Sequence, residues 1–147
     1  MRIASLAAAL VVVASPAFAH VGVTPRESKV GTTETYTFRV PSEGGMTTSA
    51  IVLDVPDGVT VISVADAKGV KHEEKKVGDR VVQVTWTVSI KAGAFAEFSL
   101  VARNPAQGEE ILWTVHQKYS DGMSSDWVGA AGTKAPAPVT KLAPAGK

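Results

Sequence analysis

Alternation of apolar and polar side chains in short runs is the feature that most constrains the fold of this chain. In residues 35–40 it places Tyr36, Phe38 and Val40 on one face and polar side chains on the other. Successive side chains of a β-strand point to opposite sides of a sheet, so a period of two is typical of strands with one buried face. Helical periodicity is scarce beyond residue 19, and we expect an all-β fold.

Further strand-like runs follow, and turn-forming residues separate them. The expected strands are 35–40, 51–55, 59–64, 80–88, 94–103, 110–119 and 124–128. Pro56-Asp57-Gly58, Asn104-Pro105 and Ser120-Asp121-Gly122 are turn signals between them. Short strands at this spacing predict an antiparallel two-sheet sandwich. A closed barrel is the alternative that the same pattern permits.

The first nineteen residues have the organisation of a secretory signal peptide. Arg2 provides a positive start, an apolar run follows over residues 3–14, and Ala17-Phe18-Ala19 is a small-x-small cleavage site. The run is short for a membrane span, although a retained membrane anchor is the alternative reading. We therefore expect cleavage after Ala19, a mature chain that begins with His20, and a periplasmic or secreted location.

The mature chain is expected to form one domain and a tail. Residues 20–130 contain the strand-like runs and predict the β-sandwich, whereas residues 131–147 are rich in Ala, Pro and Lys. Because that stretch has few large apolar groups, we expect a flexible extended tail. No hydrophobic segment follows it, so no C-terminal membrane anchor is expected.

Composition excludes several classes of function. The chain has no cysteine, which removes disulfide scaffolds, thiolate metal sites and cysteine nucleophiles. Its formal net charge is +1, and nucleic-acid binders usually carry a strongly basic face. We therefore expect no nucleic-acid partner.

Two of the three histidines have unremarkable settings. His72 stands in the charged segment 71–75, where a solvated loop residue is expected. His116 lies on the strand 110–119, with a face of Ile111, Trp113, Val115, Gln117 and Tyr119 opposite it. That face is the expected core side, so His116 is predicted to be outward and structural, with a metal role as the open alternative. Neither histidine has a His-x-His or His-x₃-His partner.

His20 differs because cleavage would make it the amino terminus. A terminal histidine offers its α-amine and its ring Nδ1 to one metal ion in a chelate ring. Two nitrogen donors of this kind favour Cu(II), which stands at the top of the divalent affinity order. On the uncleaved chain the amine is an amide and the site does not exist. An ordinary frayed first residue is the alternative.

Several segments together resemble the YcnI-like family of secreted copper-binding domains. They are His20-Val21-Gly22-Val23-Thr24-Pro25, Tyr36-Thr37-Phe38-Arg39-Val40-Pro41-Ser42-Glu43 and Gln117-Lys118-Tyr119-Ser120-Asp121-Gly122 with Trp127. Thr47-Thr48 and Val55-Pro56-Asp57-Gly58-Val59 fit the same pattern. The resemblance runs over most of residues 20–128. It implies a cupredoxin- or immunoglobulin-like β-sandwich that holds Cu(II) in a monohistidine brace.

The resemblance also implies a role for each of three residues. His20 would supply the amine and ring nitrogens, Glu43 a carboxylate oxygen, and Trp127 would pack beside the metal. Glu43 as a plain loop acid and Trp127 as ordinary core packing are the alternatives. This chain departs from the family pattern at Gly69-Val70, where an aromatic residue after the glycine is expected, and in lacking the C-terminal membrane segment common among members.

The expected function is copper capture, trafficking or homeostasis outside the cytoplasm, without catalysis. Expected partners are the copper ion and, beyond it, copper transporters or other extracytoplasmic copper proteins. Met46 and Met123 form no methionine-rich cluster, which leaves nitrogen and oxygen ligands for Cu(II). A copper-dependent oxidase or monooxygenase is one alternative, and its second histidine would have to be His72 or His116. A metal-free β-sandwich interaction module is the other.

Overall fold

The structure, a computed structural model, describes residues 20–146, and all of them lie in strands, turns and loops. The strands are β1 (Gly22–Thr24), β2 (Glu27–Lys29), β3 (Thr33–Pro41), β4 (Thr48–Asp54), β5 (Thr60–Val64), β6 (Lys71–Val77), β7 (Arg80–Ile90), β8 (Phe95–Arg103), β9 (Glu110–Leu112), β10 (Thr114–Tyr119), β11 (Ser124–Trp127) and β12 (Val139–Ala143). The predicted signal peptide lies outside the described residues. Within residues 20–146, no helix is long and apolar enough to cross a membrane.

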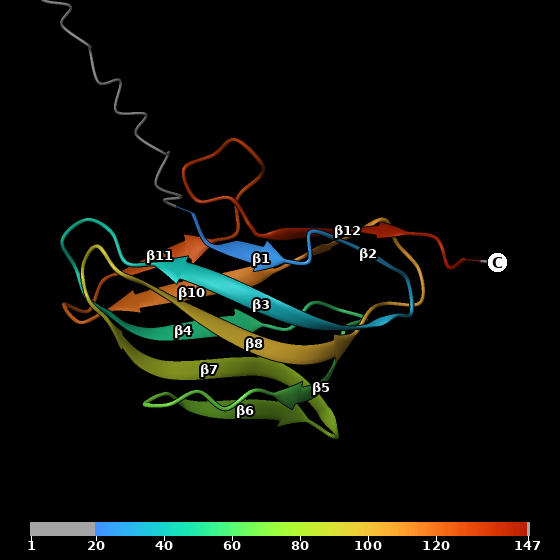
Figure 1. Ribbon diagram of the computed structural model, residues 1–147, viewed down its shortest axis with the longest axis horizontal. Helices are drawn as coiled ribbons and strands as arrows, with labels where there is room; N and C mark the ends of the chain where they lie inside the picture. Colours follow the sequence, from blue (N-terminus) through green and yellow to red (C-terminus); the bar gives the residue numbers. More distant parts are fainter. Residues whose placement is uncertain (1–19, 147) are drawn as a thin grey trace, which may run out of the picture.

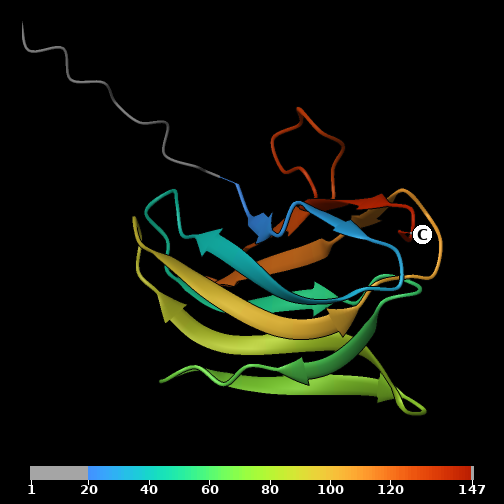
Figure 2. The same ribbon diagram turned by 45° about the vertical axis from the view of Figure 1, so that its right-hand side comes forward.

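Two antiparallel sheets stack face to face and form the body of the molecule (Figures 1 and 2). One has the strand order β1-β3-β8-β5 and the other β11-β10-β4-β7-β6. A small third sheet, β2-β12-β9, contains a parallel pair, β2 with β12. The prediction of an all-β sandwich is confirmed, and the closed-barrel alternative is wrong because the two main sheets are separate.

The core lies between the two main sheets and is built from the faces that the alternation predicted. Tyr36, Phe38 and Val40 of β3 are each at most 1% exposed. Trp113 packs between two of them, with ring centroids 4.7 Å from Tyr36 and 5.2 Å from Phe38. Trp86 packs on Phe98 in the same way, at 5.3 Å. Burying aromatic side chains of this size is the main stabilising contribution in a domain without disulfides.

The expected flexible tail is wrong for part of its length. Val139–Ala143 is strand β12, which pairs with Glu27–Lys29 on one side and Glu110–Leu112 on the other. Thr140 is fully buried, and its hydroxyl accepts a hydrogen bond from the indole of Trp113 and donates one to the carbonyl of Pro25. Composition did not predict this strand because it has few large apolar residues. One buried leucine and one buried threonine are enough to hold it in place, since the two neighbouring strands supply its backbone hydrogen bonds.

The second correction concerns the charged segment around His72. It is not a loop, because Lys71–Val77 forms strand β6 at the edge of the larger sheet. Charged residues are common on edge strands, where they oppose pairing with another chain. The expected strand 110–119 is divided at Trp113, so that β9 joins the third sheet and β10 the larger one.

Two structural arrangements position the candidate site. The edge strands β1 and β11 lie along the same side of the sandwich, opposite β5 and β6 (Figure 1). The turns 42–47, 91–94 and 120–123 gather at one end of it, because Pro41 pairs with Phe95 and Thr48 with both Ile90 and Tyr119. The start of β1 lies at that end, since Gly22 pairs with Arg39 near the end of β3.

Candidate metal centre

His20 is held at the edge of the sandwich by the strand that follows it. Val21 and Val23 are buried at 4% exposure each, and β1 pairs with β3 from Gly22, two residues after His20. His20 itself is exposed. Its ring lies 5.8 Å from the ring of Trp127 between centroids, at an interplanar angle of 58°. The structure therefore brings together two of the three residues that the sequence singled out.

Trp127 both fills the core and faces His20. It ends β11, is 7% exposed, and belongs to the main hydrophobic cluster. Its indole N–H donates a hydrogen bond of 3.1 Å to the side-chain carbonyl of Gln117. That bond fixes the orientation of the indole, and the apolar ring system of Trp127 lies beside the imidazole of His20. The two roles considered for Trp127 are compatible.

Gln117 is a central residue that the sequence analysis did not assign to the site. It is fully buried on β10, and its amide nitrogen donates to the carbonyl of Pro41 at 2.8 Å and to the hydroxyl of Thr48 at 2.7 Å. Together with the bond from Trp127, this side chain links β11 to the ends of β3 and β4. The signal was a polar residue on a strand face that is otherwise apolar. Buried polar groups need partners, so such a residue indicates a network.

The network continues into the turn that carries Glu43. The hydroxyl of Ser42 lies 2.8 Å from that of Thr48 and donates to the carbonyl of Met46 at 2.7 Å. The turn 91–94 holds the backbone of Ser42 through two hydrogen bonds. The N–H of Ser42 donates to the carbonyl of Ala94 at 2.9 Å, and the N–H of Gly93 donates to the carbonyl of Ser42 at 2.7 Å. The residue before Glu43 is thus fully buried and bonded through every polar group it has.

Glu43 lies at the start of an exposed turn. The next two residues, Gly44 and Gly45, have φ values of 70° and 73°, which side chains with a Cβ rarely adopt. They let the chain reverse directly after the glutamate, which is itself exposed. The carboxylate therefore projects from a turn whose base is rigid.

The structure places Glu43 near His20 in the topology but not in contact with it. Continuing the β1–β3 register by two residues from Gly22 and Arg39 sets His20 opposite Pro41, two residues before Glu43. Within residues 20–146 no ion pair of 4.0 Å or less joins the two side chains, and no group of three His, Asp or Glu side chains is arranged as a metal site. His20 and Glu43 nevertheless provide nitrogen and oxygen donors at one end of the sandwich, a donor set that suits Cu(II).

His116 has a different environment, and it lies on the outer face as predicted. Its Nδ1 is 2.6 Å from a carboxylate oxygen of Asp126 on β11, and its Nε2 is 2.8 Å from one of Asp54 on β4. Partial burial alone lowers the pKa of His116, but the hydrogen bonds and charges of Asp126 and Asp54 outweigh it and raise the pKa above its usual value. Both ring nitrogens are engaged with carboxylates, so this residue bridges three strands.

His72 is also far from the candidate centre in the topology. It lies on β6, which is the opposite edge of the larger sheet from β11, and it pairs with Trp86. Its Nδ1 is 3.6 Å from a carboxylate oxygen of Asp66. Neither His72 nor His116 is therefore placed to give His20 a second histidine.

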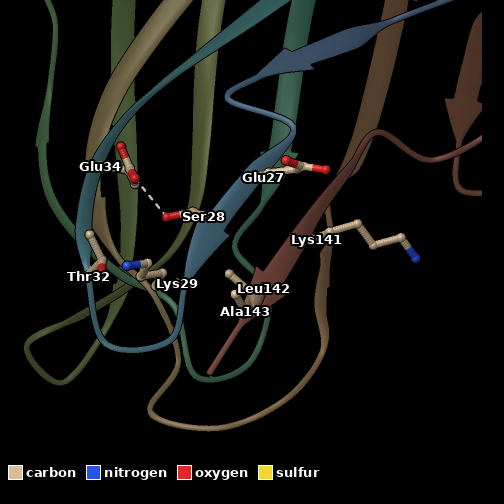
Figure 3. A pocket seen from close by; sticks show the side chains of 8 residues that line it. All are labelled: Glu27, Ser28, Lys29, Thr32, Glu34, Lys141, Leu142 and Ala143. Carbon is tan, nitrogen blue, oxygen red and sulfur yellow. Dashed lines mark hydrogen bonds between the residues drawn. The ribbon is translucent and has the colours of Figure 1, made fainter. Parts of the chain in front are cut away.

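A separate hollow between β2, β3 and β12 is occupied in part by its own polar groups (Figure 3). Ser28 donates to Glu34 at 2.7 Å and accepts a bond of 2.9 Å from Asn104. Figure 3 shows Lys141 extending away from this pair. His20 does not line this hollow, which is therefore separate from the candidate metal centre.

Comparison with solved structures defines the class of protein. A structure from Nocardia farcinica, described as an uncharacterized protein with an immunoglobulin-like fold, superposes with a TM-score of 0.73 at 28% identity, covering 84% of this chain and 98% of that one. A cohesin module from Clostridium perfringens gives a TM-score of 0.55 at 11% identity, covering 86% and 97%, a likeness of fold alone. The chain is an immunoglobulin-like β-sandwich.

Sequence comparison defines the family. Residues 20–142 match the family described as a domain of unknown function, DUF1775, and the chain belongs to it. The chain is also 38% identical over 131 residues to the copper-binding protein CutI of Bacillus subtilis, covering 87% of this chain and 64% of that protein. It thus spans less than two thirds of that relative's length. Membership of the YcnI-like family, expected from the sequence, is confirmed. The family match includes most of β12, in agreement with its place in the fold.

Proposed function

We propose that this protein binds Cu(II) outside the cytoplasm and acts in copper capture, trafficking or homeostasis rather than in catalysis. The observation that carries the proposal is the exposed His20 beside the fixed indole of Trp127. The relative from Bacillus subtilis, whose name describes a copper-binding protein, supports the choice of metal. The proposed signal peptide, residues 1–19, supports the location.

In this proposal the metal is cargo, and each residue has a distinct task. After cleavage, His20 offers its amine and its ring nitrogen, and Glu43 adds a carboxylate oxygen from its turn. Three protein donors leave positions open on Cu(II), which suits exchange with a donor or acceptor protein such as a copper transporter. Trp127 excludes water from one side of the ion, and Gln117 keeps the indole in place.

The decisive experiment compares two forms of the protein that differ only at the first residue. Cu(II) is titrated into protein beginning at His20 and into the same protein with its α-amine acetylated. We expect binding to weaken by about a hundredfold in the acetylated form, because an amide nitrogen replaces the amine and the chelate is lost. Equal affinity would contradict the proposed brace.

Glu43→Gln tests the oxygen ligand in the same titration, with Glu109→Gln as an exposed loop control. We expect only the Glu43 variant to weaken binding and change the electron paramagnetic resonance (EPR) spectrum of the bound ion. An unchanged spectrum removes Glu43 from the coordination shell while leaving the role of His20 standing.

A further inference from the structure

A groove beside His20 carries an excess of positive charge that the proposed copper site does not use. Arg26, after β1, and Arg39, on β3, line it together with His20, in a hollow of about 260 Å³. Glu97 is the one acidic residue among the lining side chains. Two guanidinium groups against one carboxylate leave one net positive charge in a small space.

Neither arginine is neutralised by a close carboxylate. Glu97 is the cross-strand partner of Arg39, yet within residues 20–146 neither Arg26 nor Arg39 has an ion pair of 4.0 Å or less. The guanidinium of Arg39 lies instead over the ring of Phe95, at 3.6 Å from its centroid. Stacking occupies the face of a guanidinium and leaves its in-plane N–H groups free to donate.

Arg39 also lies between the two proposed ligands. It lines the hollow that contains His20 and a second, smaller one that contains Glu43, Ser42 and Phe95. An anion bound to its N–H groups would therefore stand near both ligand residues. A doubly charged ion held by one glutamate would keep a net positive charge, so it would add to the attraction for an anion.

We propose that this groove takes a small carboxylate anion, which fills an open position on copper held by His20 while Arg39 and Arg26 bind its oxygens. The inference rests on the proposed copper function. A carboxylate fits because its oxygens match the guanidinium fork in pairs and are also ligands for Cu(II). The groove is thus a site for a co-ligand that arrives with the metal or leaves with it.

The test uses oxalate as the carboxylate and protein beginning at His20, which contains all the strands described above. Copper is loaded first, in the absence of oxalate, and its binding is measured by EPR. Oxalate is then added, with dialysis to verify that copper stays on the protein. We expect a saturable change in the spectrum, and about tenfold weaker oxalate binding in Arg39→Gln, because a charge-assisted pair of hydrogen bonds is lost.

Two controls separate the groove from general effects. Arg103→Gln removes an exposed arginine from β8, which lines neither hollow, and should leave oxalate binding unchanged. Copper affinity without oxalate should not fall in Arg39→Gln, since removing a positive charge cannot weaken attraction for a cation. Arg39→Lys should restore only part of the oxalate affinity, because an ammonium lacks the fork geometry.

The outcomes distinguish the two proposals. Oxalate binding that is absent in the unsubstituted protein, or equal in Arg39→Gln, overturns the groove inference and leaves the copper site standing. Failure of copper to load before oxalate is added overturns the proposed function, and the co-ligand role falls with it.

Discussion

His20 and His116 lie against β11 from different sides and differ in what surrounds their rings. His116 has a carboxylate at 2.6 Å from one nitrogen and another at 2.8 Å from the second. His20 is exposed and contacts the apolar ring of Trp127. A histidine whose two nitrogens are engaged stabilises the sheet, whereas one beside an indole keeps nitrogen available for a ligand. The surroundings of the ring, more than the presence of a histidine, separate a structural from a binding role.

Removing each imidazole in turn is the strongest test of this contrast. We expect His20→Ala to weaken Cu(II) binding by about a hundredfold, because the chelate loses its ring nitrogen. His116→Ala should leave copper affinity unchanged within about threefold, as measured by competition with a chromogenic chelator. Comparable losses in both variants would mean that the two regions do not differ as described.

The support behind Trp127 provides the next test. Gln117→Leu should lower the free energy of unfolding by about 2 kcal/mol, because the indole N–H, the Pro41 carbonyl and the Thr48 hydroxyl lose a buried partner. Urea denaturation measures the change, and Gln107→Leu in an exposed loop is the matched control. An equal, small effect in both variants would show that the network does not stabilise the site.

The smallest expected effect is the pH dependence that His116 confers. The pKa of His116 is raised in the folded state. Its contribution to the free energy of unfolding is therefore complete below the unfolded-state pKa of 6.5, and it is lost as the pH rises through the folded-state pKa. The pKa of Asp54 is lowered: burial raises it, but hydrogen bonds from Gln83 and His116 prevail, so this carboxylate contributes above 3.8. The contribution is therefore largest in the mildly acidic window between these values.

In the absence of metal, the free energy of unfolding of His116→Gln should accordingly be lower than that of the unsubstituted protein by about 1 kcal/mol near pH 5.5. Near pH 8.5 the difference should be smaller. Urea titrations at the two pH values measure this difference. A difference that is independent of pH in the His116 variant would rule out an ionic bridge.

The sequence predicted much of the fold because strand alternation is a local property. Tyr36, Phe38 and Val40 are buried as expected, and so is the face of β10 opposite His116. Strand β12 was missed because its stability comes from β2 and β9, which are distant in the chain. β6 was missed because its charges look like a loop until a neighbouring strand is known.

For the candidate site, the sequence named residues but could not predict the scaffold that holds them. His20 and Trp127 meet as the family resemblance implied, although 107 positions separate them in the numbering (127 − 20). The bonds of Gln117, Thr48 and Ser42 could not be predicted, because they depend on three strand ends meeting at one place. Among residues 20–146, Glu43 forms no ion pair of 4.0 Å or less with His20, so its role as a ligand stays a prediction.

The place of β12 between β2 and β9 has a consequence for biogenesis. Residues 27–29 find their neighbour only when residues 141–143 are present, and residues 110–112 depend on the same strand. Pairing over such a sequence distance forms late, since long loops must close first. A chain cut short before Val139 would leave two strand edges open and no hydroxyl beneath Trp113. The third sheet therefore closes as one of the last steps of folding, after residues 27–29 and 141–143 have met.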